Sequence, residues 1–115
     1  MKPASPWIVR LSQAATGDFH DILRWTAERF GTSQAELYEQ TLTAAIDALS
    51  SGPDPAGARR RKELPTGLLT LHVARKGRHG RHLLLLRIAG PKAIEVVRIL
   101  HDSMDLVRHI QPGDE

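Results

Sequence analysis

Two stretches near the N-terminus place apolar residues at helical spacing. The first expected helix begins after Ser12, whose hydroxyl can accept a hydrogen bond from the free backbone N–H groups of the first turn. Gly31 is expected to end this helix, because glycine readily adopts the left-handed conformation found there. Its apolar stripe consists of Ala15, Phe19, Ile22, Leu23, Thr26 and Phe30. The spacing therefore predicts one amphipathic helix between Ser12 and Gly31.

A second helix is expected directly after Gly31. Ser33-Gln34-Ala35-Glu36 has the pattern of a capping box, in which two side chains satisfy each other's backbone N–H groups. The buried face is expected to contain Ala35, Tyr38, Leu42, Ala45, Ile46 and Leu49. Because so few residues join the two helices, they are predicted to fold back on each other as an antiparallel hairpin.

Strand patterns surround this hairpin. A short strand is expected at 7–11, and three more at 68–74, 82–88 and 94–100. The segment 51–67 is rich in Pro and Gly and is expected to be a loop, and the short connections between the later strands favour antiparallel pairing. A final short helix is expected over 102–110. The order β-α-α-β-β-β predicts an α+β fold, with an N-terminal helical hairpin packed on a small, mostly antiparallel four-stranded twisted sheet.

The third expected strand has two different faces. Arg81, Leu83, Leu85 and Arg87 point to one side, and the alternate residues point to the other. The helical hairpin can cover only one side of the sheet, so the other is expected to be open and to be the working face. The run of leucines indicates that both sides become covered, one of them by a partner. Leu83 and Leu85 are then the expected apolar anchors for that partner.

Composition narrows the class of protein. With 115 residues and no cysteine, the chain is expected to be a single domain, 1–115, without disulfides or thiolate metal sites, as in a reducing cytoplasm. No apolar run approaches the length of a membrane span, so no membrane partner is expected. The six histidines do not form a metal-binding spacing, and no metal or cofactor is expected.

Positive charge is concentrated in one part of the chain. Residues 59–98 contain 11 basic and 2 acidic side chains, whereas the segments on either side are each net negative. Such a field attracts nucleic acid or an acidic protein. A solvated loop is the simpler alternative. No aromatic residues are interleaved with the basic run 59–62, which makes direct nucleic-acid binding the weaker hypothesis.

Three sequence blocks resemble the RelE/ParE superfamily of type II toxin–antitoxin toxins, and its ParE branch in particular. They are Glu63-Leu64 followed by Gly67-Leu68, Gly80-Arg81-His82 leading into Leu86-Arg87-Ile88, and 97–101 followed by Met104-Asp105. The resemblance extends over residues 8–110. It implies a small toxin that is neutralised by a cognate acidic antitoxin, ParD-like or of another family, and that forms a hetero-oligomer with it.

The superfamily contains two functional classes. ParE-type members inhibit DNA gyrase by protein–protein contact, which is the function expected here and is not enzymatic. RelE-type members are ribosome-dependent, metal-independent mRNA endoribonucleases, and the alternative assigns catalysis to Arg81, Arg98 and His101. Asp102 stands where such ribonucleases have a tyrosine, and the only tyrosine, Tyr38, is expected in the core. His101 has the alternative of a structural role at the strand end.

A third class is a degraded toxin that still binds its antitoxin without being toxic. In each protein-binding case, the basic loop, the following hairpin and the C-terminal strand are expected to form the contact surface. The residues expected to bind the target or antitoxin are Arg59, Arg60, Arg61, Arg75, Lys76, Arg78, Arg81, Leu83, Leu85, Arg87, Arg98 and His101.

Overall fold

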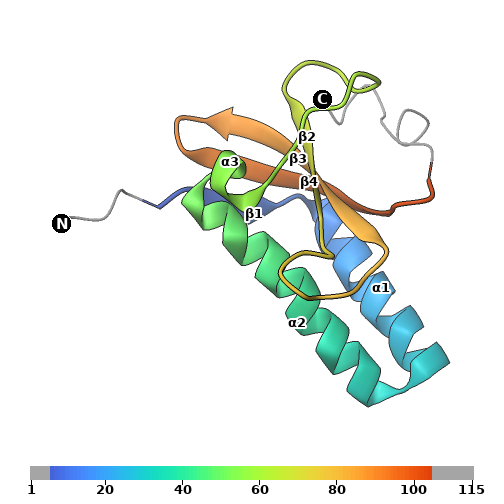
Figure 1. The fold of residues 1–115 in the computed structure, drawn as a ribbon. Helices are drawn as coiled ribbons and strands as arrows, with labels where there is room; N and C mark the ends of the chain where they lie inside the picture. Colours follow the sequence, from blue (N-terminus) through green and yellow to red (C-terminus); the bar gives the residue numbers. More distant parts are fainter. Residues whose placement is uncertain (1–5, 105–115) are drawn as a thin grey trace.

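The computed structural model describes residues 6–104, and its elements follow the expected order (Figure 1). Strand β1 (Ile8–Leu11) is followed by helices α1 (Gln13–Phe30) and α2 (Thr32–Ala48). A 3-10 turn, η1 (Leu49–Ser51), and a one-turn helix, α3 (Pro53–Ala56), come next, and neither was expected. Strands β2 (Leu68–His72), β3 (His82–Gly90) and β4 (Ala93–His101) complete the chain. The expected helix over 102–110 lies outside the described residues except for its first three positions, which form a turn.

Ser12 fixes the start of α1 and also joins it to the sheet. Its Oγ accepts a hydrogen bond from the Ala15 N–H at 3.0 Å, as expected of the helix cap. The same hydroxyl donates to the Val97 carbonyl oxygen of β4 at 2.6 Å. The first turn of α1 is therefore positioned by a strand far away in the sequence.

The expected capping box of α2 is wrong. Gly31 adopts a φ of 95°, which lets α2 begin at Thr32, so Ser33 and Glu36 lie inside the helix. No side chain caps this N-terminus. The physical reason is the positive φ of glycine, which turns the chain within a single residue. The antiparallel hairpin itself is confirmed, and Figure 1 shows its two helices side by side beneath the sheet.

The sheet has the strand order β1-β4-β3-β2, so the last strand is internal, as expected. β1 pairs with β4 in parallel, and the other two pairings are antiparallel. The β3–β4 register shifts between Leu85, which pairs with Arg98, and Leu86, which pairs with Val96. Val97 is the extra residue of this bulge. It interrupts the simple alternation of faces along β4.

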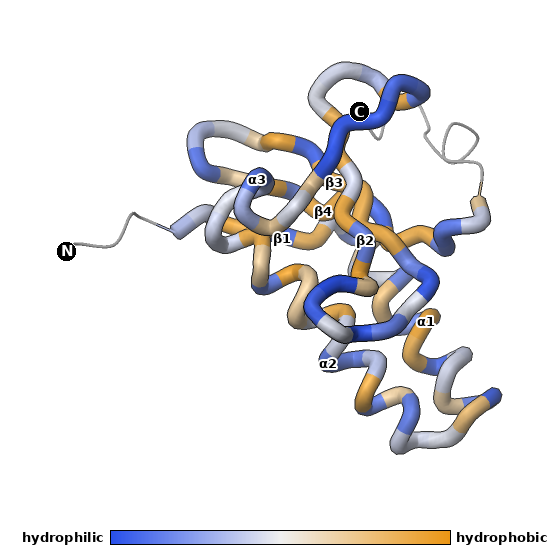
Figure 2. Tube along the Cα trace, viewed as in Figure 1, coloured by the Kyte–Doolittle hydropathy of each residue, from blue (hydrophilic) through white to orange (hydrophobic). Residues whose placement is uncertain are grey.

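The helical hairpin covers one face of the sheet. Leu42 and Leu49 of this layer are fully buried against Leu84, Leu86 and Val96 of the strands. Burying a leucine side chain contributes roughly 1.5–3 kcal/mol, so this interface is a main source of stability. Figure 2 shows the apolar residues concentrated in the strands, with hydrophilic loops before and after β2.

The reverse face of the sheet is not open, which corrects the expectation from the sequence. Leu83 and Leu85 are fully buried there, and they pack in an apolar cluster with Leu64 of the loop before β2. The other members of this cluster are Leu68, Val97 and Leu100. The chain therefore covers its own reverse face, because the Pro- and Gly-rich loop folds back with one leucine pointing inward. Leu83 and Leu85 are core residues and are not exposed anchors.

Candidate functional site

A groove with mostly apolar walls lies between the second half of α1 and the end of the β3–β4 ladder. Its volume is about 830 Å³. Trp25 and Phe30 of α1 remain 51% and 63% exposed along it, although both are large aromatic side chains. The lining residues are Asp21, Ile22, Trp25, Thr26, Phe30, Gln34, Tyr38, Gly80, Arg81, His82, His101, Ser103 and Met104. Exposed aromatic side chains in a concave surface are typical of a site that binds another molecule.

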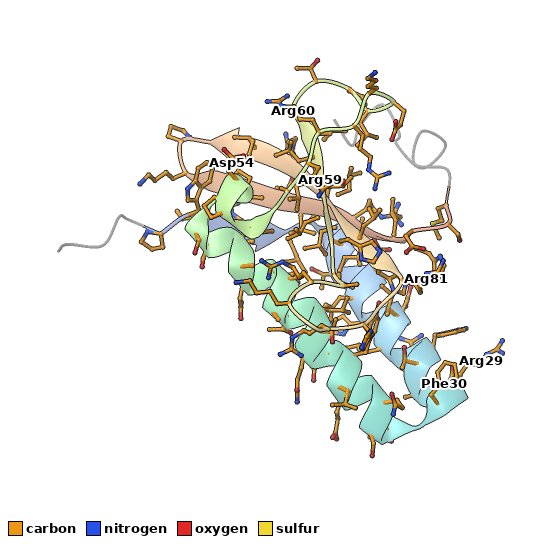
Figure 3. The ribbon with its side chains drawn as sticks, viewed as in Figure 1. Arg29, Phe30, Asp54, Arg59, Arg60 and Arg81 are labelled. Atoms are coloured by element: carbon orange, nitrogen blue, oxygen red, sulfur yellow. The ribbon has the colours of Figure 1, made fainter. Side chains whose placement is uncertain are left out.

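Helical spacing positions the aromatic wall of the groove. Trp25 and Phe30 meet edge to face with ring centroids 5.8 Å apart. The Arg29 guanidinium lies 5.3 Å from the centre of the Trp25 ring, in a cation–π arrangement. Figure 3 shows Arg29 and Phe30 near the free end of the helical hairpin. Phe30 was expected in the buried stripe of its helix. The structure exposes it because the hairpin extends past the sheet.

Tyr38 and His82 form a hydrogen-bonded pair at the other end of the groove. Tyr38 Oη lies 2.6 Å from His82 Nδ1 and accepts a hydrogen bond from the Arg81 backbone N–H at 3.3 Å. Burial, reinforced by the nearby His101, lowers the pKa of His82 to about 4. His82 is therefore neutral near pH 7, and one hydrogen bond joins its ring to the Tyr38 hydroxyl. Burial also raises the pKa of Tyr38, which keeps the phenol protonated.

Gly80 makes this contact possible. A Cβ atom on Gly80 would lie 2.7 Å from Cε1 of Tyr38 and 2.8 Å from Cγ2 of Val73, closer than real Cβ contacts allow. Tyr38 was expected to be a plain core residue, and its pairing with His82 was not predicted. The local signal for it is a glycine two residues before β3, because glycine allows another group to approach the backbone closely.

His101 lies on the same side of the ladder as His82. The two rings meet edge to face at 5.3 Å, and His101 Nδ1 lies 2.7 Å from Ser103 Oγ. The expected structural contact at this strand end was with Asp105, which lies outside the described residues. Within residues 6–104, the side-chain partner of His101 at hydrogen-bond distance is Ser103.

Asp102 binds Arg81 and His72 at the end of the sheet. Its carboxylate accepts hydrogen bonds from Arg81 Nε at 3.1 Å and from His72 Nε2 at 2.8 Å. The hydrogen bond from His72, together with Arg81, lowers the pKa of the Asp102 carboxyl. Arg81 therefore approaches the groove as part of an ion pair, and its charge is largely neutralised.

Arg87 and Arg98 are also engaged within the fold. Arg98 makes a bidentate ion pair with Asp18 of α1, at 2.8 Å from Nε and 3.0 Å from Nη2. Arg87 pairs with Glu95 on the neighbouring strand. The structure brings Arg81 and His101 to the same end of the sheet but directs Arg98 to α1. In place of three free arginines on a common cationic face, the structure pairs Arg81, Arg87 and Arg98 each with a carboxylate.

The remaining expected binding residues lie on the two segments that flank β2. Arg61 donates from Nε to Thr70 Oγ1 at 3.1 Å and lies 3.8 Å from Glu63. Arg75 donates to the Ala56 carbonyl oxygen at 3.1 Å. Arg59, Arg60, Lys62, Lys76 and Arg78 are exposed. Figure 3 shows Arg59 and Arg60 far from Phe30, so these cations do not belong to the groove.

The described residues contain no cluster of three or more His, Asp or Glu side chains able to hold a metal ion. No helix among residues 6–104 is long and apolar enough to cross a membrane.

Solved structures share this fold. A chain described as the chromosomal ParDE toxin–antitoxin system from P. aeruginosa superposes with a TM-score of 0.70 at 22% identity, over 85% of this chain and 98% of that one. A chain of the toxin–antitoxin complex RelBE2 from Mycobacterium tuberculosis gives a TM-score of 0.56 at 22% identity, covering 88% and 97%. These likenesses show that the chain shares its fold with both structures, as the sequence resemblance implied.

Relatives of known class show which family of toxins the chain belongs to. Toxin ParE1 of Mycobacterium tuberculosis is 36% identical over 100 residues, covering 87% of this chain and 94% of the relative. Toxin ParE of Escherichia coli is 31% identical over 100 residues, covering 87% and 89%. The family model described as the ParE toxin of the type II toxin–antitoxin system parDE matches residues 9–106. The chain belongs to the ParE family of type II toxins.

Proposed function

We propose that this protein inhibits DNA gyrase by protein–protein contact in the cytoplasm and that a cognate acidic antitoxin neutralises it. Membership of the ParE family supports the first part. The groove supports contact with a protein, because its wall exposes Trp25 and Phe30 beside Arg29. Tryptophan and arginine are enriched among the residues that dominate protein interfaces. The exposure of Trp25 is the single observation on which this proposal most depends.

The antitoxin is proposed to occupy the same groove and so to compete with the target. The solved structures that resemble this chain are described as toxin–antitoxin systems. An amphipathic segment could place apolar side chains against Trp25 and Met104 while its acidic side chains face the basic loops. Mutually exclusive binding in one groove is a direct way to neutralise a toxin whose action is contact.

A ribonuclease is the second candidate, because the structure gathers Tyr38, His82, His101 and Arg81 at one end of the groove. General acid–base chemistry requires groups that are free to exchange protons with the substrate. Tyr38 and His82 are instead hydrogen-bonded to each other, and Arg81 forms an ion pair with Asp102. Arg98, the third expected catalytic residue, is held by Asp18. These contacts favour gyrase inhibition over RNA cleavage.

A supercoiling assay with purified gyrase tests the proposal. The unmodified protein should inhibit supercoiling, and Trp25→Ala should weaken inhibition at least tenfold, the loss typical of an aromatic interface residue. Leu37→Ala is the matched control, because Leu37 is 54% exposed on α2 and does not line the groove. Lack of inhibition by the unmodified protein would refute gyrase inhibition. Equal effects of the two substitutions would refute the role of the groove.

Messenger RNA integrity during expression separates the two candidates. Gyrase inhibition predicts DNA damage and filamentous cells, with mRNA that stays intact both for the unmodified protein and for His101→Ala. Rapid mRNA loss that disappears in His101→Ala would instead establish the ribonuclease. A thermal melt of His101→Ala shows whether the fold is retained. Absence of toxicity, with antitoxin binding preserved, would identify the degraded-toxin class.

A further inference from the structure

Two groups of cations on and around the sheet differ in whether a carboxylate pairs with them. The arginines at the end and centre of the sheet are neutralised: Arg81 by Asp102, Arg87 by Glu95 and Arg98 by Asp18. The second group consists of Arg59, Arg60, Lys62, Lys76 and Arg78, which we call the cationic edge. In the part of the chain described, no ion pair involves any of these five side chains.

The cationic edge is arranged along one border of the sheet. β2 is the outer strand, and the Arg59 backbone bridges to Thr70 of β2 through two hydrogen bonds of 2.8 Å. Three of the cations precede β2 and two follow it, on the hydrophilic loops that Figure 2 shows at its two ends. The Arg75 side chain bonds the Ala56 carbonyl oxygen, which ties the second loop to the segment before the first. Both loops are thus held to the sheet.

The cations are spread along one border of the sheet. Arg59 lies opposite Thr70, in the middle of β2, and Lys76 and Arg78 follow the end of this strand. Double-stranded DNA carries one negative charge about every 1.7 Å along its axis. Flexible Lys and Arg side chains along the edge can therefore contact several phosphates of one duplex.

The chemistry around the edge favours phosphate over an acidic protein. A protein interface usually needs apolar anchors at its centre. Among the described residues, the hollow that contains Arg59 and Arg60 has one large exposed apolar side chain, Ile88, beside the half-buried Trp7, and it also contains Asp54. The exposed aromatic anchors Trp25 and Phe30 lie instead in the groove. Double-stranded DNA needs no anchors or stacking aromatic residues, because its phosphates supply most of the non-specific affinity.

We propose that the cationic edge binds the phosphate backbone of duplex DNA without regard to sequence. The choice of a DNA duplex over RNA rests on the proposed inhibition of gyrase, an enzyme that holds duplex DNA. In this arrangement the groove contacts the protein while the edge contacts the DNA bound to it. Direct nucleic-acid binding was the weaker expectation because no aromatic residues are interleaved with the basic run, but contact with duplex phosphates does not need them.

Fluorescence anisotropy with the full chain and a labelled 20-base-pair duplex of mixed sequence tests this inference without gyrase. The Kd should be micromolar at 50 mM salt, in the range of non-specific binding. If about four phosphates are contacted, affinity should fall roughly 100-fold between 50 and 200 mM salt. Arg59→Gln/Arg60→Gln/Lys62→Gln should weaken binding at least tenfold at 50 mM salt and flatten the salt dependence.

A charge-matched variant is the control. Arg10→Gln/Arg24→Gln/Arg29→Gln removes the same charge from β1 and α1, and its affinity should change less than threefold. Equal losses in the two triple variants would overturn the proposal, because net charge alone would then explain binding. Lys76→Gln/Arg78→Gln offers a second probe of the edge should the first triple variant fail a thermal-melt check of folding.

Competitors identify the class of ligand. Unlabelled duplex should displace the probe, whereas poly-glutamate of equal charge should compete at least tenfold less well. Equal competition by poly-glutamate would overturn the proposal in favour of an acidic protein, and tighter binding of single-stranded RNA would overturn the choice of duplex. DNA binding without gyrase inhibition would refute only the proposed function. Gyrase inhibition without DNA binding would refute only this inference.

Discussion

Asp18 of α1 holds Arg98 of β4 across 80 residues of sequence. The same carboxylate accepts a hydrogen bond from the Ile99 backbone N–H at 2.9 Å. β1 ends at Leu11, opposite Val96, so β4 continues past its parallel partner. Asp18 therefore takes the place of a neighbouring strand, and its ion pair anchors α1 to the uncovered edge of β4.

Asp18→Ala should consequently destabilise the protein. Removing one partner of a buried pair typically costs about 3–5 kcal/mol, and the partial exposure of this pair reduces the expected loss to about 2–3 kcal/mol. Urea unfolding followed by circular dichroism measures it. Asp21→Ala is the control, because Asp21 pairs with Arg24 at 3.9 Å on the solvent-exposed side of α1, where a loss below about 0.5 kcal/mol is expected. Equal losses would contradict the anchoring role.

Replacing either of two glycines by alanine should change the stability of the protein, in opposite directions at the two positions. Gly80→Ala places a methyl group against Tyr38 and Val73 and should cost about 1–3 kcal/mol. Gly17→Ala lies within α1 with nothing within 4 Å of the new atom, and should stabilise by up to about 1 kcal/mol because alanine favours helix. Thermal melting of both variants checks this. If Gly80→Ala were as stable as the unmodified protein, the Tyr38 ring would have to move away from the new methyl group without loss of stability.

His82 should make stability fall in mild acid. Its pKa drops from 6.5 in the unfolded chain to about 4 in the fold, so the unfolded state binds more protons between these values. The contribution of neutral His82 is fully present above pH 6.5 and is lost as the pH falls to about 4. Because the ring is partly exposed, we expect the free energy of unfolding to fall by about 2 kcal/mol over this pH range.

Urea unfolding at pH 7 and pH 4.5 tests the role of His82. The loss of stability between these values should be smaller in His82→Gln than in the unmodified protein, since glutamine does not titrate. Direct titration of the His82 ring by NMR should give a midpoint near 4. A midpoint near 6.5 would mean that water reaches the ring freely.

The substitutions Leu83→Ala and Leu85→Ala should each destabilise the fold. Both side chains are buried under the loop that carries Leu64, so truncation should cost about 2–5 kcal/mol by leaving a cavity. Ile88→Ala, on the same strand but 41% exposed, should cost less than about 1.5 kcal/mol. Chemical denaturation of the three variants measures the difference. Small losses at Leu83 and Leu85 would indicate that the loop is readily displaced.

Local patterns predicted most of the architecture. The Ser12 cap, the two amphipathic helices, the strands and the internal position of β4 are confirmed, because each depends on spacing within a few residues or on the superfamily resemblance. The predicted capping box at Ser33 is wrong because Gly31 turns the chain within one residue, so the helix begins before Ser33. The bulge at Val97 left no local signal, although it determines how the second half of β4 is directed.

The site was harder to predict because its contacts join distant parts of the chain. Tyr38 and His82 are 44 residues apart, and His72 and Asp102 are 30 apart. Nothing near Arg98 in sequence indicates that Asp18 neutralises it. A count of arginines therefore overestimated the charge available on the sheet and missed the aromatic groove, whose exposure depends on how far the hairpin extends.

The parallel pairing of β1 with β4 has a consequence for synthesis. β1 leaves the ribosome before β4, so the sheet cannot close until β4 has been synthesised. Such long-range pairing forms late, after local elements such as the helical hairpin. The groove borders on the end of β4, so it too cannot form before this strand is in place.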